Sequence, residues 1–174
     1  MTPPGSLSAP ATVERVGQLL RALQGRGVDA WGALDGVIGD ELAAQGSALA
    51  LPLTFRTATG QELPLSSDGL RRALPDARAR VCVLVHGLMS SESVWSFSGR
   101  PGVTYGELLA RDHGVTPVYV RYNSGRHVST NGRDLAAGLQ QLVRCWPVRV
   151  REIDLIGHSM GGLVVRSACH YGRH

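Results

Sequence analysis

Five consecutive apolar residues, Val81 to Val85, constrain the fold of this chain more than any other segment. An apolar run without alternation is typical of a strand buried on both faces, as in a parallel sheet that helices cover. From this run to residue 172, segments with strand patterns alternate with segments of helical period. Such alternation implies right-handed crossovers between parallel strands. We therefore predict an α/β fold with a mostly parallel sheet and helices on both faces.

The segments after this strand carry the caps and periodicities of the remaining elements. Thr104 and Glu107 have the spacing of a capping box, and Gly114 can end the helix that they start. The next helix has an expected buried stripe of Leu135, Leu139, Leu142, Val143 and Trp146. In all, we predict helices over 104–112, 131–145 and 159–172, and strands over 81–85, 116–123 and 151–157.

The chain before residue 81 divides into an accessory segment and the start of the main domain. Residues 48–66 have the pattern of two strands around the turn Thr59-Gly60, and we expect this hairpin to form an antiparallel edge of the sheet. Residues 66–80 are interpreted as a linker. Residues 1–47 hold a proline-rich lead-in, expected to be disordered, and two helical patterns. The predicted boundaries are thus 1–47 for the accessory segment and 48–174 for the domain.

A G-x-S-x-G motif, Gly157 to Gly161, stands between the last predicted strand and the last predicted helix. In a chain with 22 glycines, roughly 0.2 matches are expected by chance, so the context carries the argument. A serine at a sharp strand-to-helix turn is held in a strained backbone conformation, with its hydroxyl lifted clear of the sheet. Side chains two positions before and after it would collide with neighbouring backbone. The helix N-terminus also favours negative charge beside Ser159.

A nucleophilic serine also needs N–H donors for the oxyanion that forms during reaction. The N–H of Met160, directly after the serine, is the first predicted donor. The second is expected in the loop after the first apolar strand, which begins with His86 and Gly87. We assign it to the N–H of Leu88, with Met89 as the alternative.

Three segments resemble the lipase/esterase branch of the α/β-hydrolase superfamily: VCVLVHGLMSSESVW, YVRYNSGRHVSTNGRDLA and IDLIGHSMGGLVVRSA. The similarity is greatest to bacterial hydrolases of the inositol-deacylase-like and triacylglycerol-lipase-like group, over residues 50–172. It implies a partial α/β-hydrolase fold and hydrolysis of carboxylic esters through an acyl-enzyme on Ser159. It also implies an oxyanion hole made by the N–H groups of Met160 and Leu88. The residues that would support this site are His86, Gly87, Gly157, His158 and Gly161.

The acid and the base that such a serine requires are missing from the expected part of the sequence. In this fold both follow the serine along the chain, yet no Asp or Glu follows Ser159. His170 would lie about 16 Å further along the helix axis, and His174 is placed still worse, whereas a base must come within about 3 Å. Other candidates are interpreted as shaping the site or as structural: His86, His158, Asp154 and Asp134, the last as a charge in the first turn of its helix.

The predicted strand 151–157 would also be an unpaired edge, although its apolar pattern is that of a central strand. The resemblance implies about three further strands, which carry the acid and the histidine. We therefore expect this chain to be the N-terminal portion of a longer hydrolase, with the C-terminal strands missing and the 174 residues alone inactive. Exposed strand edges associate, so pairing through this edge is expected.

The strand-to-helix turn that carries Ser159, called the elbow, is also compatible with other functions. A thioesterase or an acyltransferase would use the same serine, and a hydrolase-fold remnant without catalysis would act as a binding module. The expected partner is a small-molecule or lipid ester. Arg126 and His127 either approach a polar group of the substrate or form a solvated loop, and Trp95 and Phe97 either line an acyl pocket or pack their loop onto the sheet.

Several function classes are not predicted. The net charge is +4, but all 18 basic residues are scattered arginines, and no zinc-finger spacing, basic helix or aromatic ladder indicates nucleic-acid binding. No metal-ligand spacing or phosphate loop implies a cofactor. The cysteines, Cys82, Cys145 and Cys169, are interpreted as buried free thiols. No signal-peptide pattern or membrane-spanning apolar run is visible, which favours a cytoplasmic location.

Overall fold

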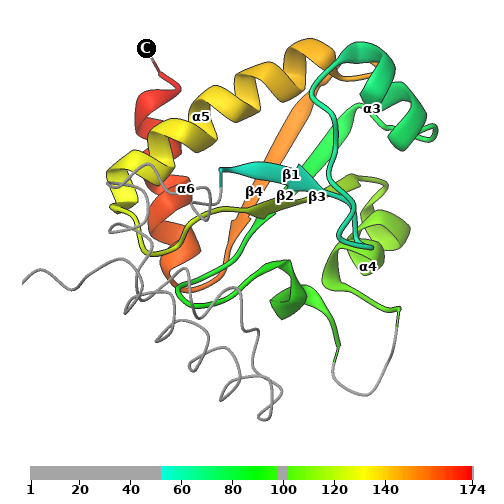
Figure 1. Ribbon diagram of the computed structural model, residues 1–174. Coiled ribbons are helices and arrows are strands. Elements are labelled where there is room, and N and C mark those ends of the chain that lie inside the picture. The colour runs from blue at the N-terminus through cyan, green and yellow to red at the C-terminus, as the bar shows by residue number, and fades with distance from the viewer. Residues whose placement is uncertain (1–51, 98–101, 174) are drawn as a thin grey trace, which may run out of the picture.

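The computed structural model describes residues 52–97 and 102–173, which form a four-stranded mixed sheet with helices around it (Figure 1). The strands are β1 Thr54–Arg56, β2 Arg80–Val85, β3 Thr116–Arg121 and β4 Glu152–Gly157, in the spatial order β1-β3-β2-β4. β2 pairs in parallel with β3 and with β4, and β1 pairs antiparallel with β3. The predicted partial α/β fold with an antiparallel N-terminal strand at its edge is confirmed. The accessory segment 1–47 lies outside the described residues.

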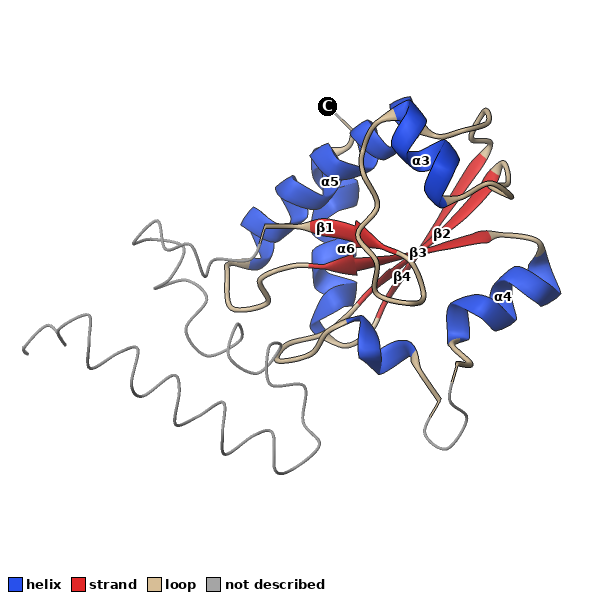
Figure 2. Ribbon diagram, turned by 45° about the vertical axis from the view of Figure 1, so that its right-hand side comes forward, coloured by secondary structure: helices blue, strands red, loops and turns tan. Residues whose placement is uncertain are grey.

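Helices cover both faces of this sheet (Figure 2). One face carries α3 Ser67–Ala73, α5 Val128–Cys145 and α6 Met160–Tyr171, and the other carries α4 Tyr105–His113 and the 3-10 helix η1 Glu92–Trp95. The side chains of β2 alternate between two hydrophobic clusters: Val81, Val83 and Val85 join the first, and Cys82 and Leu84 the second. All five are at most 2% exposed. The apolar run is therefore buried on both faces, as its lack of alternation predicts.

The predicted start of α4 is confirmed at the level of single hydrogen bonds. Thr104 Oγ1 accepts from the N–H of Glu107 (3.1 Å), and the Glu107 carboxylate accepts from the N–H of Thr104 (2.8 Å). This reciprocal pair satisfies two N–H groups that a helix start leaves open. The helix ends at Gly114, whose N–H donates to the carbonyl of Ala110 (3.1 Å).

Two segments before β2 differ from the prediction. Residues 66–80, interpreted as a linker, contain α3, because Ser66 Oγ caps its first turn through the N–H of Gly69 (3.2 Å) and Leu70 is fully buried. The second arm of the hairpin is shorter than expected, since it pairs with β1 only through a single bridge from Glu62 to Arg56.

Helix α5 begins three residues earlier than predicted, and this changes two interpretations. Asp134 does not lie in the first turn; its carboxylate instead pairs with Arg126, with an Nη1–Oδ2 distance of 2.8 Å. Of the predicted stripe, Leu135, Leu142 and Trp146 are buried, but Val143 is 41% exposed. Consecutive helical residues point about 100° apart, so Val143 turns away from the sheet when Leu142 faces it.

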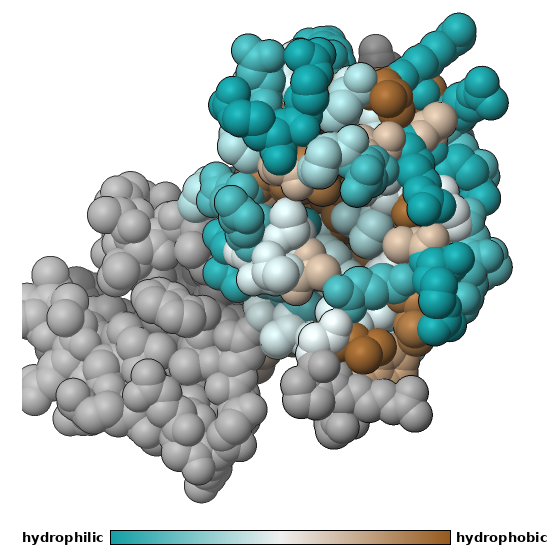
Figure 3. All heavy atoms as spheres, turned by 90° about the vertical axis from the view of Figure 1, so that its right-hand side faces the viewer, coloured by the Kyte–Doolittle hydropathy of each residue, from teal (hydrophilic) through white to brown (hydrophobic). Residues whose placement is uncertain are grey.

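Strand β4 forms an edge of the described sheet, where it pairs with β2 alone. Apolar side chains near this edge are accessible, among them Ile156 on the strand and Leu163 on α6. By contrast, the face on the side of α4 is mostly hydrophilic, with apolar residues in small separate patches (Figure 3).

None of the described helices has both the length and the apolar composition needed to cross a bilayer.

The three cysteines differ in exposure. Cys82 and Cys145 are buried as predicted, but Cys169 on α6 is exposed. Burial, and then the negative charge of Asp154, raises the pKa of the Cys82 thiol to about 11. The thiolate is the reactive form, so a thiol-disulfide exchange reagent at pH 8 is expected to modify Cys169 but to reach Cys82 only after unfolding. Peptide mass mapping checks this order, and equal rates at both thiols would contradict it.

The same pKa shift predicts how stability depends on alkaline pH. The folded state holds the Cys82 proton up to about pH 11, whereas the thiol of the unfolded chain loses its proton near its ordinary pKa of 9.0. The contribution to the free energy of unfolding is therefore complete below pH 9 and is lost between about pH 9 and 11.

Candidate active site

The turn between β4 and α6 has the backbone geometry of a strained elbow. Ser159 stands between the two elements with φ 53° and ψ −125°, in a region that L-residues rarely occupy. Apart from Met89, no other non-glycine residue within 52–97 and 102–173 has a positive φ. Such conformations cost of order 1–3 kcal/mol and persist only where the surroundings enforce them. The Ser159 side chain is exposed, at the end of the sheet where β4 terminates.

Close backbone contacts on either side of Ser159 leave no room for a side chain at the two motif glycines. A Cβ atom on Gly161 would lie 2.3 Å from the carbonyl oxygen of Val85 and 2.4 Å from that of His86. A Cβ atom on Gly157 would lie 2.4 Å from the backbone nitrogen of Gly162. Real Cβ atoms essentially never approach other atoms this closely. Helix α6 can therefore start directly against the end of β2 only because these positions lack side chains.

The loop after β2 lies against the elbow. A Cβ atom on Gly87 would be 3.1 Å from both Ser159 Cβ and the carbonyl oxygen of His158. The N–H of His158 donates to the carbonyl of Val85 (2.9 Å), which extends the β2–β4 pairing to the elbow itself. Two segments more than 70 residues apart in the sequence therefore meet at Ser159.

The backbone N–H groups around Ser159 differ in whether they donate to an acceptor. The N–H groups of Leu88 and Met160 donate to no acceptor within the described residues. The N–H of Met89, the alternative donor, instead donates to Ser124 Oγ (3.1 Å). No described hydrogen bond reaches Ser159 Oγ. The arrangement thus leaves a hydroxyl and two free amides on segments that touch one another.

His86 is placed in the interior rather than at the reaction surface. It is fully buried, and its ring stacks on Tyr122 at 4.4 Å between centroids. Its Nδ1 lies 2.9 Å from the carbonyl oxygen of Gly87, so that nitrogen donates its proton there. The Tyr122 hydroxyl donates to the carbonyl of His86 (2.8 Å), and burial raises the pKa of Tyr122 far above its usual range. His86 accordingly shapes the loop.

His158 is exposed beside Ser159, with its ring edge-on to Trp95 at 6.3 Å. Trp95 itself is 8% exposed and belongs to the cluster formed by Cys82, Leu84 and Tyr119. Of the two predicted roles for Trp95, packing its segment onto the sheet is therefore the one that the structure supports.

Other candidate residues lie apart from Ser159 or are engaged elsewhere. His170 lies near the C-terminal end of α6, about 16 Å along the axis from the serine. Asp154 lies 3.4 Å from the guanidinium of Arg80 within the sheet. His127 is exposed at the start of α5, next to the paired Arg126. No group of three or more side chains that could hold a metal ion occurs in the part of the chain that the structure describes.

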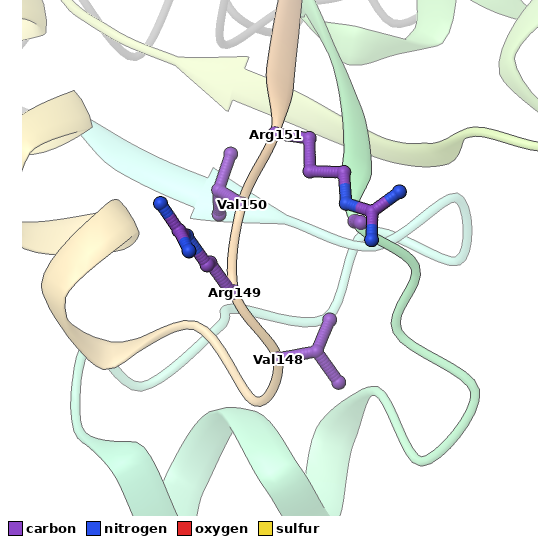
Figure 4. A pocket seen from close by; sticks show the side chains of 5 residues that line it. Val148, Arg149, Val150 and Arg151 are labelled. Atoms are coloured by element: carbon purple, nitrogen blue, oxygen red, sulfur yellow. The ribbon is translucent and has the colours of Figure 1, made fainter.

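Two cavities lie away from the nucleophile. One of about 630 Å³ is lined by Ala79 and by residues 148–151, where the chain enters β4 (Figure 4). Six strand residues, about 20 Å, separate this end of β4 from the elbow. A second cavity of about 630 Å³ lies between α5, α6 and β4, beside Leu139 and Ile153. Ser159 lines neither, so neither provides a pocket for an acyl chain bound at the serine.

Three residues that support the loop were not singled out from the sequence: Tyr122, Ser124 and Asn131. All three are at most 2% exposed. The Nδ2 of Asn131 donates to the carbonyl oxygen of Asn123 (2.9 Å) and so holds the turn that carries Ser124. A cluster of small polar residues directly after a buried strand is the signal in the sequence, but it does not reveal which partners they bind.

Comparison with known proteins identifies one family. The model of the family described as "Putative serine esterase (DUF676)" matches residues 76–174, which include β2, its following loop, β4 and the elbow. No curated protein and no solved structure matches the chain.

Proposed function

The chain belongs to the putative serine esterase family, and on that premise we propose that it hydrolyses carboxylic esters with Ser159 as the nucleophile. The observation that carries this proposal is the strained, exposed Ser159 with the free N–H groups of Met160 and Leu88 on the segments that touch it. A backbone conformation this unfavourable is unusual in a purely structural turn, and it is frequent where a side chain must be presented to a substrate.

In the proposed reaction, Ser159 Oγ attacks the ester carbonyl carbon while a general base takes the hydroxyl proton. The carbonyl oxygen becomes an oxyanion that the amides of Leu88 and Met160 stabilise. The C–O bond to the leaving group then breaks, and the alcohol departs with the proton from the base. Water attacks the resulting acyl-enzyme by the same route, which releases the acid and restores Ser159.

We place the general base and its acid outside residues 1–174. His86 is buried against Tyr122, and His170 is about 16 Å from the serine along α6. A base acts only within about 3 Å of the proton that it takes. Segments that pair with the open edge of β4 would be well placed to supply both groups.

A fluorophosphonate probe tests the nucleophile, because its phosphorus bonds to an activated serine oxygen and releases fluoride. We expect labelling of the protein made from the complete coding sequence, with the adduct on Ser159, and much slower labelling of residues 1–174 alone. Ser159→Ala should abolish labelling. Ser167→Ala, which changes another serine on α6, should not alter it.

The other outcomes have definite meanings. No adduct on Ser159 in the complete protein would refute the hydrolase and favour a non-catalytic binding module. Rapid hydrolysis of simple esters by a monomeric, cooperatively folded 1–174 chain would refute the external base. Matched oxygen esters and thioesters in the same assay distinguish an esterase from a thioesterase.

A further inference from the structure

The loop that carries the proposed oxyanion donor has an unfavourable backbone at one residue. Met89 has a φ of 55°, although its side chain is 43% exposed and is not held by burial. For a residue other than glycine this conformation needs support from outside the loop. The described support is a single hydrogen bond from the N–H of Met89 to Ser124 Oγ (3.1 Å).

Ser124 is itself held firmly. It is 2% exposed and lies in the turn that follows β3, next to Asn123, which is 1% exposed. The side chain of Asn131 on α5 donates to the carbonyl oxygens of Asn123 (2.9 Å) and Arg126 (3.3 Å). Arg126 is paired in turn with Asp134 on the same helix. The hydroxyl of Ser124 is therefore presented from a turn anchored to α5.

A second contact joins the same two segments. The Tyr122 hydroxyl donates to the carbonyl of His86 (2.8 Å), and the two rings stack. The start of the loop is thus fixed by Tyr122 and its end by Ser124, while Leu88 lies between them with no acceptor for its N–H in the described residues.

We propose that Ser124 is a positioning residue for the oxyanion hole. By accepting from the N–H of Met89, it withdraws that amide from the reaction and orients the amide of Leu88 toward the oxyanion site. This inference rests on the proposed function, and it explains why the amide of Leu88 acts as the oxyanion donor rather than the amide of Met89.

The test compares Ser124→Ala with Ser124→Thr, which keeps the hydroxyl, in the protein made from the complete coding sequence. The rate of fluorophosphonate labelling at Ser159 should fall by about 10-fold to 100-fold in Ser124→Ala, because a phosphonate oxygen occupies the oxyanion site. For an ester substrate, kcat should fall while KM changes little, since the donor acts in the transition state. Ser124→Thr should recover most of the rate.

Thr116→Val provides the matched control. Thr116 is 8% exposed at the start of β3, and its Oγ1 accepts from the backbone N–H of Arg78 (2.8 Å), so the change removes a similar buried bond at the opposite end of the sheet from the oxyanion loop. Its labelling rate should equal that of the wild type. If Ser124→Ala is labelled as fast as Thr116→Val, the positioning role is refuted.

A readout independent of activity separates this inference from the proposed function. Hydrogen exchange of the Met89 amide, measured by NMR, should be about tenfold or more faster in Ser124→Ala than in the wild type. If the wild type is not labelled at all, the proposed function fails. Whether or not the wild type is labelled, unchanged exchange at Met89 in Ser124→Ala would show that Ser124 does not hold the loop.

Discussion

Gly161→Ala should disrupt the elbow and lower the free energy of unfolding by about 3 kcal/mol or more. The added methyl group would lie 2.3 Å from the carbonyl oxygen of Val85 and 2.4 Å from that of His86. Both are backbone atoms at the end of the central strand, so no side-chain rotation relieves the collision. Helix α6 must instead move away from β2, which also separates Ser159 from the oxyanion loop and should reduce labelling by about 100-fold or more.

Gly162→Ala is the matched control for this substitution. It changes the neighbouring glycine in the same helix, where the nearest atom to an added Cβ is the Gly157 carbonyl oxygen at 3.8 Å. Alanine favours helix over glycine by up to about 1 kcal/mol, so Gly162→Ala should be neutral or slightly stabilising. Urea unfolding of both variants measures the difference. Equal stabilities would show that α6 does not start tightly against β2.

Ser159→Gly should separate stability from activity. Glycine adopts positive φ without a steric cost, so the substitution releases the 1–3 kcal/mol stored at φ 53°, less the entropy that glycine adds to the unfolded chain. We expect the free energy of unfolding to rise by about 1 kcal/mol while hydrolysis falls to the background rate. Ser159→Ala should lose activity equally but gain no stability, because alanine remains strained.

Thermal or urea unfolding of the two Ser159 variants, with the fluorophosphonate assay, checks this prediction. The comparison isolates backbone strain, since both variants lack the nucleophilic hydroxyl. An unchanged or lower stability of Ser159→Gly relative to Ser159→Ala would mean that the turn is not strained at this residue.

The errors of sequence interpretation have common physical causes. Seven residues give too short a pattern for the sequence to indicate helix α3, and the stability of this helix depends on the burial of Leu70 by distant segments. The sequence places Asp134 in a first turn because nothing in it marks Val128 as the start of α5. There, His127 makes no side-chain cap. Such boundaries depend on tertiary contacts, which local patterns do not contain.

The sequence by itself determined the features that depend on neighbouring residues. An unbroken apolar run predicted a strand buried on both faces, and a serine flanked by glycines between strand and helix predicted the elbow, because both are local consequences of side-chain size and period.

Only the tertiary structure decided which amides around the serine stay free. Met89 and Ser124 are 35 residues apart, and their hydrogen bond forms because two parallel strands end side by side. That bond engages the amide of Met89, whereas the amide of Leu88 has no acceptor within the described residues; the sequence left these two amides as alternative donors.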